Sequence, residues 1–441
     1  MYKALDSLAN KLLPTWLYIR LIGQWDRGGF NKYFQNTSWL FLAKVVSFVT
    51  SILMLAIVAR YLGPENYGKI SYAQSFIALF SIFASLGIDQ ILYRDLVAHP
   101  EKDKILLGTA FISKIIFGTL AFFITTGFAI FLNTDPVLNW IIALMALSFI
   151  LQPFGVITHF FHAKVLSKYP SYISIVVTLL LPALKLIVIY FDKGIIFFAS
   201  IFAAEALMYA IGNLYIYKRF LRDSIFSWQL SFSTFISLMQ RSWPLILAGL
   251  SGYLYARIDQ VMIQQILNSR SVGLYDAAVR LTEYLNFVPG IIISSMFPAI
   301  INAQKNNSLV YSKRLRSLAT LCIAITFLSS LTLFLLAPLL IKLFYGSDFS
   351  ESILILQVYV WSTIGTISII LIQQYFIAEN RPRLFLLYAI FGAVLNILLN
   401  LSLIPTFGAI GAAIATLITL LGINIVFFIH KIFFWKPFVA K

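Results

Sequence analysis

The stretch Tyr67-Gly68-Lys69-Ile70-Ser71-Tyr72-Ala73 returns 205 positions later as Val272-Gly273-Leu274-Tyr275-Asp276-Ala277-Ala278. The apolar run before each stretch also opens alike, with Ser38-Trp39 in the first half and Ser242-Trp243 in the second. The second half of the chain therefore repeats the first. A duplicated bundle of this kind holds its site where the halves meet, and a polar substrate bound there can be exposed to each side of a membrane in turn.

Composition indicates that most of the chain lies in a membrane. Hydrophobic residues make up 60% of the 441 residues and the mean hydropathy is +0.88, whereas charged residues make up 11%. Soluble domains carry roughly 25% charged residues. The sequence therefore predicts an all-α, polytopic membrane protein, in which most side chains face lipid or one another.

The chain offers twelve segments of the length that a spanning helix needs, which is about 20 mostly apolar residues. They are 37–60, 70–91, 105–132, 137–160, 170–191, 194–217, 243–266, 276–302, 317–343, 351–378, 384–404 and 408–431. Pro and Gly interrupt several of them, at Pro153-Gly155, Pro182, Pro289-Gly290 and Pro338. We expect two six-helix lobes, 37–217 and 243–441, around a central lumen.

Two basic and aromatic stretches flank the lobes. The tail 1–36 and the linker 218–242 mix Lys and Arg with Trp and other apolar residues. This mixture predicts helices that lie on the anionic inner leaflet, and a merely solvated linker is the alternative. Charged residues interrupt the tail, so no cleavable signal is expected.

The distribution of Lys and Arg predicts the orientation. One side of the predicted spans carries 23 of them and the other carries six. By the positive-inside rule both termini are placed in the cytoplasm. Six helices per half is an even number, so the second half starts on the same side as the first and the repeat is parallel.

The connections offer little room for an enzyme. The predicted outer loops are short and carry no clustered His, Cys or carboxylates of the kind that a hydrolytic or metal site needs. The single Cys322 excludes a disulfide framework and a cysteine metal cluster. We therefore predict a protein that is not an enzyme, with no catalytic residues, no metal site and no cofactor.

Three lysines stand inside predicted helices of the first half, namely Lys44, Lys114 and Lys185. An unpaired Lys at the bilayer centre costs about 2.5–3.5 kcal/mol, so each should face a hydrated cavity or a counter-charge. One of them could pair with Glu205 or reach an interface. Glu205 cannot neutralise all three, which favours a polar lumen.

The second half places charges on its first two helices. Arg257 and Asp259 are two positions apart and point to different faces, whereas Asp276, Arg280 and Glu283 are spaced to form an ion-pair ladder. Asp259 lies in an apolar run, where a buried carboxylate suits proton or ion coupling. We predict Lys44, Lys114, Lys185, Arg257 and Arg280 as substrate-binding residues, and Asp259, Glu283 and Asp89 as ion-coupling residues. The pair Asn396 and Asn400 is more typical of helix packing.

The chain resembles the polysaccharide (O-antigen and capsule) flippases of the multidrug/oligosaccharidyl-lipid/polysaccharide exporter superfamily. The resemblance covers nearly the whole chain and is carried by four blocks, which are Ala59–Ala73 with Leu86–Asp89, Tyr255–Ile263, Val272–Arg280 and Gly408–Thr416. It implies a bacterial inner-membrane protein that moves an undecaprenyl-diphosphate-linked sugar unit to the outer leaflet. The partners expected are that lipid, membrane lipids and a downstream polysaccharide polymerase, and no nucleic acid.

The basic residues fit this expectation, because a diphosphate needs fixed cations while it crosses hydrocarbon. An H⁺ or Na⁺ gradient is the expected source of energy. Other functions stay open, namely export of a drug or of another lipid precursor within the same superfamily, and a membrane polymerase or ligase. An exporter of cationic drugs should have a site lined by acids, whereas the first half has three deep lysines. A polysaccharide polymerase or ligase typically needs a large outer loop with catalytic side chains.

Overall fold

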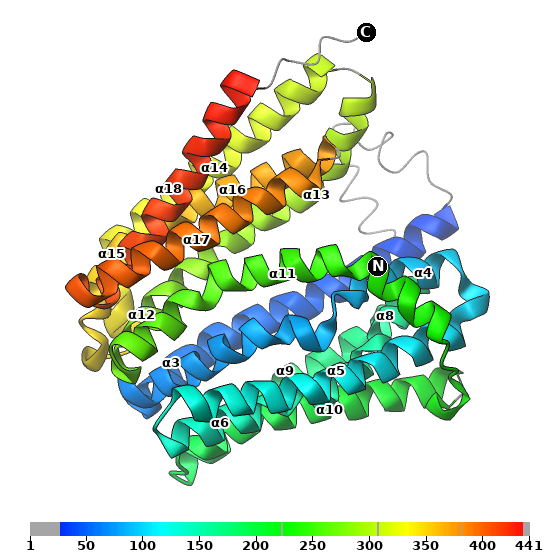
Figure 1. The fold of residues 1–441 in the computed structure, drawn as a ribbon, viewed down its shortest axis with the longest axis horizontal. Helices are drawn as coiled ribbons and strands as arrows, with labels where there is room; N and C mark the ends of the chain where they lie inside the picture. The colour runs from blue at the N-terminus through cyan, green and yellow to red at the C-terminus, as the bar shows by residue number, and fades with distance from the viewer. Residues whose placement is uncertain (1–26, 222–223, 307, 380, 435–441) are drawn as a thin grey trace.

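The computed structural model describes residues 27–221, 224–306, 308–379 and 381–434. Within these ranges all regular elements are helices (Figure 1), as the sequence predicts. The first half forms α3 (Arg27–Ser85), α4 (Ile88–Ala98), η1 (Pro100–Lys102), α5 (Asp103–Leu132), α6 (Pro136–Ala146), α7 (Ser148–Leu151), η2 (Gln152–Gly155), α8 (Val156–Ala163), α9 (Lys168–Tyr190) and α10 (Ile195–Leu221).

The second half is built in the same way. It forms η3 (Ile225–Ser227), α11 (Phe232–Ile266), α12 (Ser269–Glu283), η4 (Tyr284–Asn286), α13 (Phe287–Asn306), α14 (Ser308–Phe344), η5 (Ser347–Phe349), α15 (Ser352–Tyr359), α16 (Ser362–Ala378), α17 (Pro382–Phe407) and α18 (Ala409–Phe434). Figure 1 shows α3 to α10 packed as an N-terminal lobe and α12 to α18 as a C-terminal lobe, with α11 running along the boundary.

Backbone chemistry explains where the helices bend and begin. Gly63 interrupts α3 with a φ of 68°, and the following Pro64 has no N–H to continue the helical hydrogen bonds, so the two halves of α3 meet at a kink. The side chain of Asp135 caps α6 by accepting a hydrogen bond from the N–H of Val137 at 2.9 Å. Gly87, with a φ of 61°, allows the turn that starts α4.

Nine stretches of the described residues are long and apolar enough to cross a membrane. They are Asn36–Ala98, Pro100–Leu132, Pro136–Ala163, Lys168–Tyr190, Ile195–Phe220, Leu309–Phe344, Ser352–Ala378, Arg383–Phe407 and Ala409–His430. The first combines the predicted segments 37–60 and 70–91 across the kink. The predicted segments 243–266 and 276–302 are not among the nine. A count of twelve spans therefore remains a prediction.

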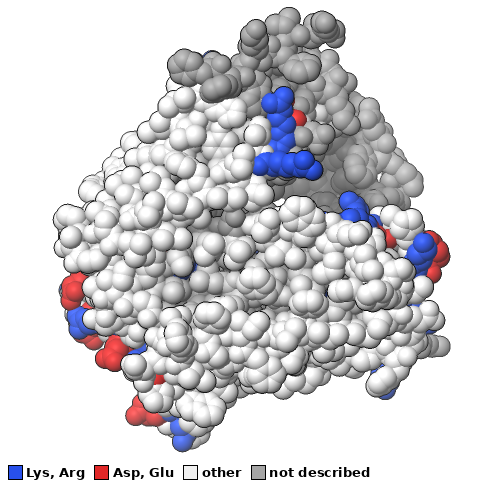
Figure 2. Space-filling view, in the orientation of Figure 1, with Lys and Arg blue, Asp and Glu red and all other residues white. Residues whose placement is uncertain are grey.

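The surface has the charge pattern of a protein that crosses a membrane. Figure 2 shows Lys, Arg, Asp and Glu gathered at opposite edges of the molecule, with a broad uncharged band between them. Ion pairs of Lys69 with Asp135 at 2.8 Å, and of Arg270 with Glu351 at 2.7 Å, lie where α6 and α12 begin. An uncharged band of this kind is what the hydrocarbon core requires.

The predicted linker 218–242 does not form a helix of its own. Its first residues continue α10, its middle holds the short turn η3, and its last residues belong to α11. The start of α11 is attached to the N-terminal lobe, where Arg241 donates two hydrogen bonds to Asp95, at 2.9 and 2.6 Å. The predicted interfacial helix of the tail 1–36 lies largely outside the described residues, and from Arg27 onward the chain is part of α3.

The lobes touch where two glycines related by the repeat cross. A Cβ atom at Gly68 would lie 1.7 Å from the carbonyl oxygen of Ser269, and one at Gly273 would lie 2.0 Å from that of Pro64. Only glycine allows backbones to approach this closely. In Figure 1 the lobes converge at this contact between α3 and α12 and diverge toward α4 and α13.

Further contacts close the converging end. Arg60 donates hydrogen bonds to the carbonyl oxygens of Lys342 and Leu343, at 3.2 and 2.5 Å. On the other side of the crossing, Gln265 donates to the Tyr72 hydroxyl at 3.0 Å. The structure is therefore closed at the end where α12 begins.

Candidate substrate site at the boundary between the lobes

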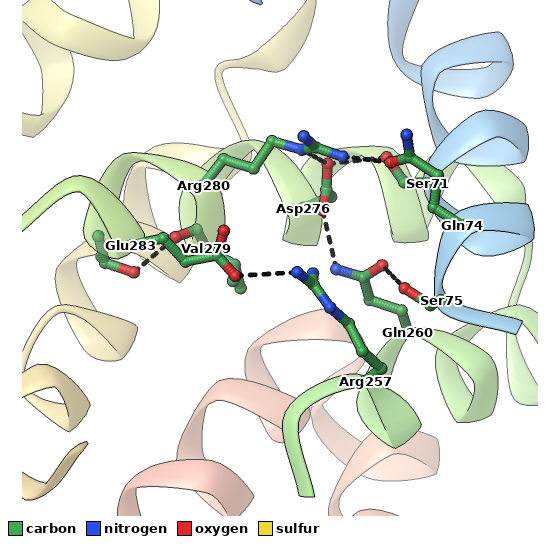
Figure 3. Close-up of polar contacts among 10 residues, drawn as sticks. Ser71, Gln74, Ser75, Arg257, Gln260, Asp276, Val279, Arg280 and Glu283 are labelled. Atoms are coloured by element: carbon green, nitrogen blue, oxygen red, sulfur yellow. Dashed lines mark hydrogen bonds and ion pairs between the residues drawn. The ribbon is translucent and has the colours of Figure 1, made fainter. Parts of the chain in front are cut away.

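A polar network crosses the boundary between the lobes beside the glycine contact (Figure 3). At its centre lies Asp276 of α12, whose carboxylate is fully buried. It accepts hydrogen bonds from Ser71 at 2.7 Å, from Gln260 at 2.8 Å and from Arg280 at 2.5 Å. Ser71 and Asp276 occupy equivalent positions of the two repeats, so the repeat itself brings them together.

Arg280 carries this network into the N-terminal lobe. Its Nη2 donates to Oε1 of Gln74 on α3 at 2.5 Å, and its guanidinium lies 6.0 Å from the ring centroid of Tyr67. Ser75 donates to Oε1 of Gln260, which completes a second link between the lobes. A buried carboxylate is stable only with such donors, and Asp276 has three.

Two more of the predicted cations reach the same region. Arg257 of α11 forms an ion pair with Glu283 at 3.3 Å, and both side chains are partly exposed (Figure 3). Lys185 of α9 lies within electrostatic range of Arg280 and of Glu205. Arg257 and Arg280 thus lie in one region of the boundary (Figure 3), and the charge of Lys185 on α9 interacts with that of Arg280.

The predicted ladder along α12 is confirmed in its first step and wrong in its second. Arg280 pairs with Asp276 four positions earlier. Glu283 instead pairs with Arg257, because α11 passes beside the end of α12. The spacing of residues along one helix could not reveal this partner on another.

Lys114 lies elsewhere, in a separate cluster of the N-terminal lobe. Its side chain is buried and forms an ion pair with Asp89, which also lies 3.1 Å from Nε2 of His159. The deep lysines therefore have a second acid besides Glu205, because Asp89 neutralises Lys114. Lys44 is exposed on the first half of α3 and makes no ion pair with the described residues.

Asp259 of α11 is held only by neutral donors. It is buried and accepts hydrogen bonds from Tyr275 at 2.6 Å, from Thr416 at 2.6 Å and from Asn400 at 2.7 Å. Asn400 also donates to Asn396, so this pair does more than pack helices together. The oxygen Oδ1 of Asn400 is buried and has no hydrogen-bond partner within the described part of the chain.

No group of three or more His, Cys, Asp or Glu residues among the described residues could hold a metal ion. The partners of Asp259 could not be found from the sequence. Tyr275 and Thr416 stood in stretches that resemble the flippase family, but their role there was not apparent.

This arrangement defines an integral membrane protein with two repeated lobes and a charged boundary between them. Residues 33–304 match the protein family described as "Polysaccharide biosynthesis protein", and the chain belongs to that family. The resemblance seen in the sequence is thereby confirmed.

Two curated relatives come from Haloferax volcanii. The chain is 25% identical over 201 residues to the "Probable low-salt glycan biosynthesis flippase Agl15", and this match covers 45% of this chain and 42% of the relative. It is 28% identical over 172 residues to the "Probable flippase AglR", and this match covers 38% of this chain and 36% of the relative. The matched part spans less than half the length of these curated relatives.

Solved structures share the fold over most of the chain. The lipid II flippase MurJ in an inward closed conformation has a TM-score of 0.72 at 15% identity. The match covers 90% of this chain and 87% of the MurJ chain. An inward-facing MATE multidrug transporter of the MOP superfamily has a TM-score of 0.67 at 14% identity, with coverage of 87% and 96%. Its outward-facing counterpart has a TM-score of 0.59 at 15% identity, with coverage of 90% and 94%. The fold expected from the sequence is confirmed.

Proposed function

We propose that the protein is a flippase that moves an undecaprenyl-diphosphate-linked oligosaccharide, such as an O-antigen, capsule or exopolysaccharide repeat unit, from the cytoplasmic to the outer leaflet. Membership of the polysaccharide biosynthesis family and the names of the two relatives support this proposal. Both relatives are named as flippases, which are transporters and not enzymes, in line with the expectation of no catalytic activity.

The observation that carries the proposal is the group of cations at the boundary. Lys185, Arg257 and Arg280 come from three helices of both lobes, and each interacts with a different acid, namely Glu205, Glu283 and Asp276. A diphosphate headgroup would replace those partners and bridge the lobes. Arginine is suited to this role because its guanidinium binds phosphate oxygens in pairs.

Alternating access would move the headgroup. The lobes are closed where α12 begins and diverge toward α4 and α13 (Figure 1), and the fold is more similar to the inward-facing than to the outward-facing MATE structure. These features support a cytoplasm-facing conformation. In the opposite conformation the contacts around Gly68 and Gly273 would open and the diverging ends would meet.

We further propose that Asp259 couples transport to an H⁺ or Na⁺ gradient. Its carboxylate and the unpaired Oδ1 of Asn400 form a buried group of oxygens without an ion-pair partner among the described residues. Such a group suits a proton or a small hard cation. Glu283 and Asp89, the other predicted ion-coupling residues, are each occupied by a cation of the protein.

Bacterial inner-membrane location, cytoplasmic termini and a downstream polymerase as partner belong to the same proposal. Among the alternatives, export of cationic drugs is less well supported, because three cations gather at the boundary. A membrane polymerase or ligase is also less well supported, because both curated relatives are named as flippases.

Complementation of a deletion strain tests the proposal. Without the gene, lipid-linked repeat units should accumulate on the cytoplasmic face. The Arg280→Ala variant should restore little surface polysaccharide, whereas the Arg270→Ala variant, which alters an exposed arginine at the closed end, should restore it. If Arg280→Ala reaches the membrane in normal amounts and exports normally, the boundary site is not where the diphosphate binds.

A further inference from the structure

A cavity of about 620 Å³ opens inside the N-terminal lobe. Its walls come from α3, α6, α7, η2, α8 and α10, and one residue of α11, Tyr253, reaches it from the lobe boundary. Small-molecule sites are typically clefts of about 300–1,000 Å³ with mostly apolar walls and a few placed polar groups. The cavity is thus large enough to hold part of a substrate.

Three polar side chains of the cavity are available to a ligand. Glu205 has no hydrogen bond or close ion pair with the described residues, and its charge interacts with that of Lys185. Gln152 and Tyr253 are exposed, and neither side chain has a hydrogen-bond partner in the described ranges. A carboxylate, an amide and a phenol together accept and donate hydrogen bonds as sugar hydroxyls require.

Aromatic rings form much of the remaining wall. Phe149, Phe154 and Phe202 line the cavity together with the ring of Tyr253. Such rings present flat apolar faces beside the polar groups. The C–H faces of a pyranose ring would pack on them while its hydroxyls turn to Glu205 and Gln152.

The cavity adjoins the cationic boundary. Gln74 lines the cavity and at the same time accepts the hydrogen bond from Arg280. Glu205 likewise lies in the cavity wall, and its charge interacts with that of Lys185. A headgroup held by Arg280 and Lys185 would therefore have its next atoms at the cavity entrance.

We propose that this cavity is the binding subsite for the first sugars of the substrate, and that it selects uncharged sugars over acidic ones. The proposal rests on the flippase function and adds the place and class of the glycan. Among the lining residues Glu205 carries a negative charge, and His159 lies against Asp89, which Lys114 also neutralises. A uronic acid in this cavity would therefore meet a like charge, while Lys185, whose charge interacts with that of Glu205, would be occupied by the diphosphate.

Binding to the purified full-length protein in nanodiscs tests this subsite. The probes are undecaprenyl diphosphate, the same lipid carrying an N-acetylglucosamine disaccharide, and the same lipid carrying a disaccharide with glucuronic acid. The wild type should bind the neutral glycolipid about tenfold more tightly than the bare lipid, as hydrogen bonds to an ionised group would give. The acidic glycolipid should bind no more tightly than the bare lipid.

The Glu205→Gln variant should lose most of the extra affinity that the neutral disaccharide provides, while its affinity for the bare lipid stays unchanged. It should also no longer discriminate against glucuronic acid. Tyr253→Leu, at an exposed position, should also reduce the extra affinity that the neutral disaccharide provides. Glu351→Gln, an acid-to-amide change at the closed end, is the matched control and should alter none of the three affinities.

The subsite is overturned if the wild type binds neutral glycolipid and bare lipid equally, or if Glu205→Gln weakens both by the same factor. Failure of the flippase proposal looks different. In that case the wild type would not bind undecaprenyl diphosphate, or Arg280→Ala would not weaken that binding. The difference in affinity between the neutral glycolipid and the bare lipid would still show whether the sugar subsite exists.

Discussion

Lys114 shows how strongly the structural context of one residue changes its interpretation. Its side chain is 1% exposed and its charge is already neutralised by Asp89. Removing one partner of such a pair deprives the other of compensation, and Asp89 would then keep only its contact with His159. The pairing favours a structural role over the predicted contact with substrate.

We therefore expect Lys114→Ala to lower the stability of the protein by roughly 1–3 kcal/mol, with the low end favoured because Asp89 is partly exposed. Thermal unfolding of the purified variant and its abundance in membranes measure this effect, and export per molecule should change little. Normal stability together with lost export would instead support direct binding of substrate by Lys114.

Asp259 is the residue for which a role in energy coupling can be tested most directly. Asp259→Asn keeps the shape of the side chain but removes its charge, so it should abolish export driven by an imposed H⁺ or Na⁺ gradient while protein abundance stays near normal. Asp348→Asn, at an exposed position, serves as control. Undiminished gradient-driven export by Asp259→Asn would refute the assignment.

Sequence reasoning succeeded where partners are close in the chain and failed where they are distant. The spacing of Asp276 and Arg280 on one helix predicts their ion pair, which the structure contains. The isolation of Asp259 was also apparent, but Asn400 and Thr416 lie 141 and 157 positions away and could not be identified as its donors. The pairing of Lys114 with Asp89 depends on the turn at Gly87, which no periodicity reveals.

At the scale of elements, proline and glycine had different effects from place to place. Pro182 and Pro338 lie inside the continuous helices α9 and α14, whereas Gln152–Gly155 form a 3-10 turn. α3 is kinked at Gly63, which lies between the predicted segments 37–60 and 70–91. Composition therefore predicts the helices well, but the packing around each proline decides whether a helix bends.

The start of α6 offers a test of helix capping. Asp135 accepts a hydrogen bond from Val137 and pairs with Lys69. Asp135→Ala should destabilise the protein by about 1 kcal/mol, the usual cost of a lost N-cap, and Asp135→Asn, which keeps the cap, should cost less. Thermal unfolding of both variants measures the difference, and equal losses would show that the ion pair is the larger contribution.

The same carboxylate makes this contribution depend on pH. Burial opposes ionisation of Asp135, but hydrogen bonds from Lys69 and Val137 outweigh it, so the pKa of the carboxyl lies below its ordinary value of 3.8. The stabilisation is therefore present above that value and is lost as the pH falls through the lower pKa of the folded state.

At the scale of the whole molecule, the bias of basic residues predicts the orientation in the membrane. In a Cys322→Ser background, single cysteines at Thr134 and Ser347 should react with an impermeant reagent in intact cells. Cysteines at Glu101 and Ser312 should react only after permeabilisation. All four positions are exposed in the structure, so a reversed pattern would show that the termini lie outside.

The crossing of Gly68 and Gly273 gives the molecule a fulcrum. Because the backbones of α3 and α12 touch there, the two lobes cannot be pressed closer at that point. The lobes extend from it as long, stiff helical arms, and a small rotation about the crossing becomes a wide displacement at their far ends. Leverage of this kind would let weak contacts near the fulcrum govern a large opening for a bulky headgroup, with little bending of any helix.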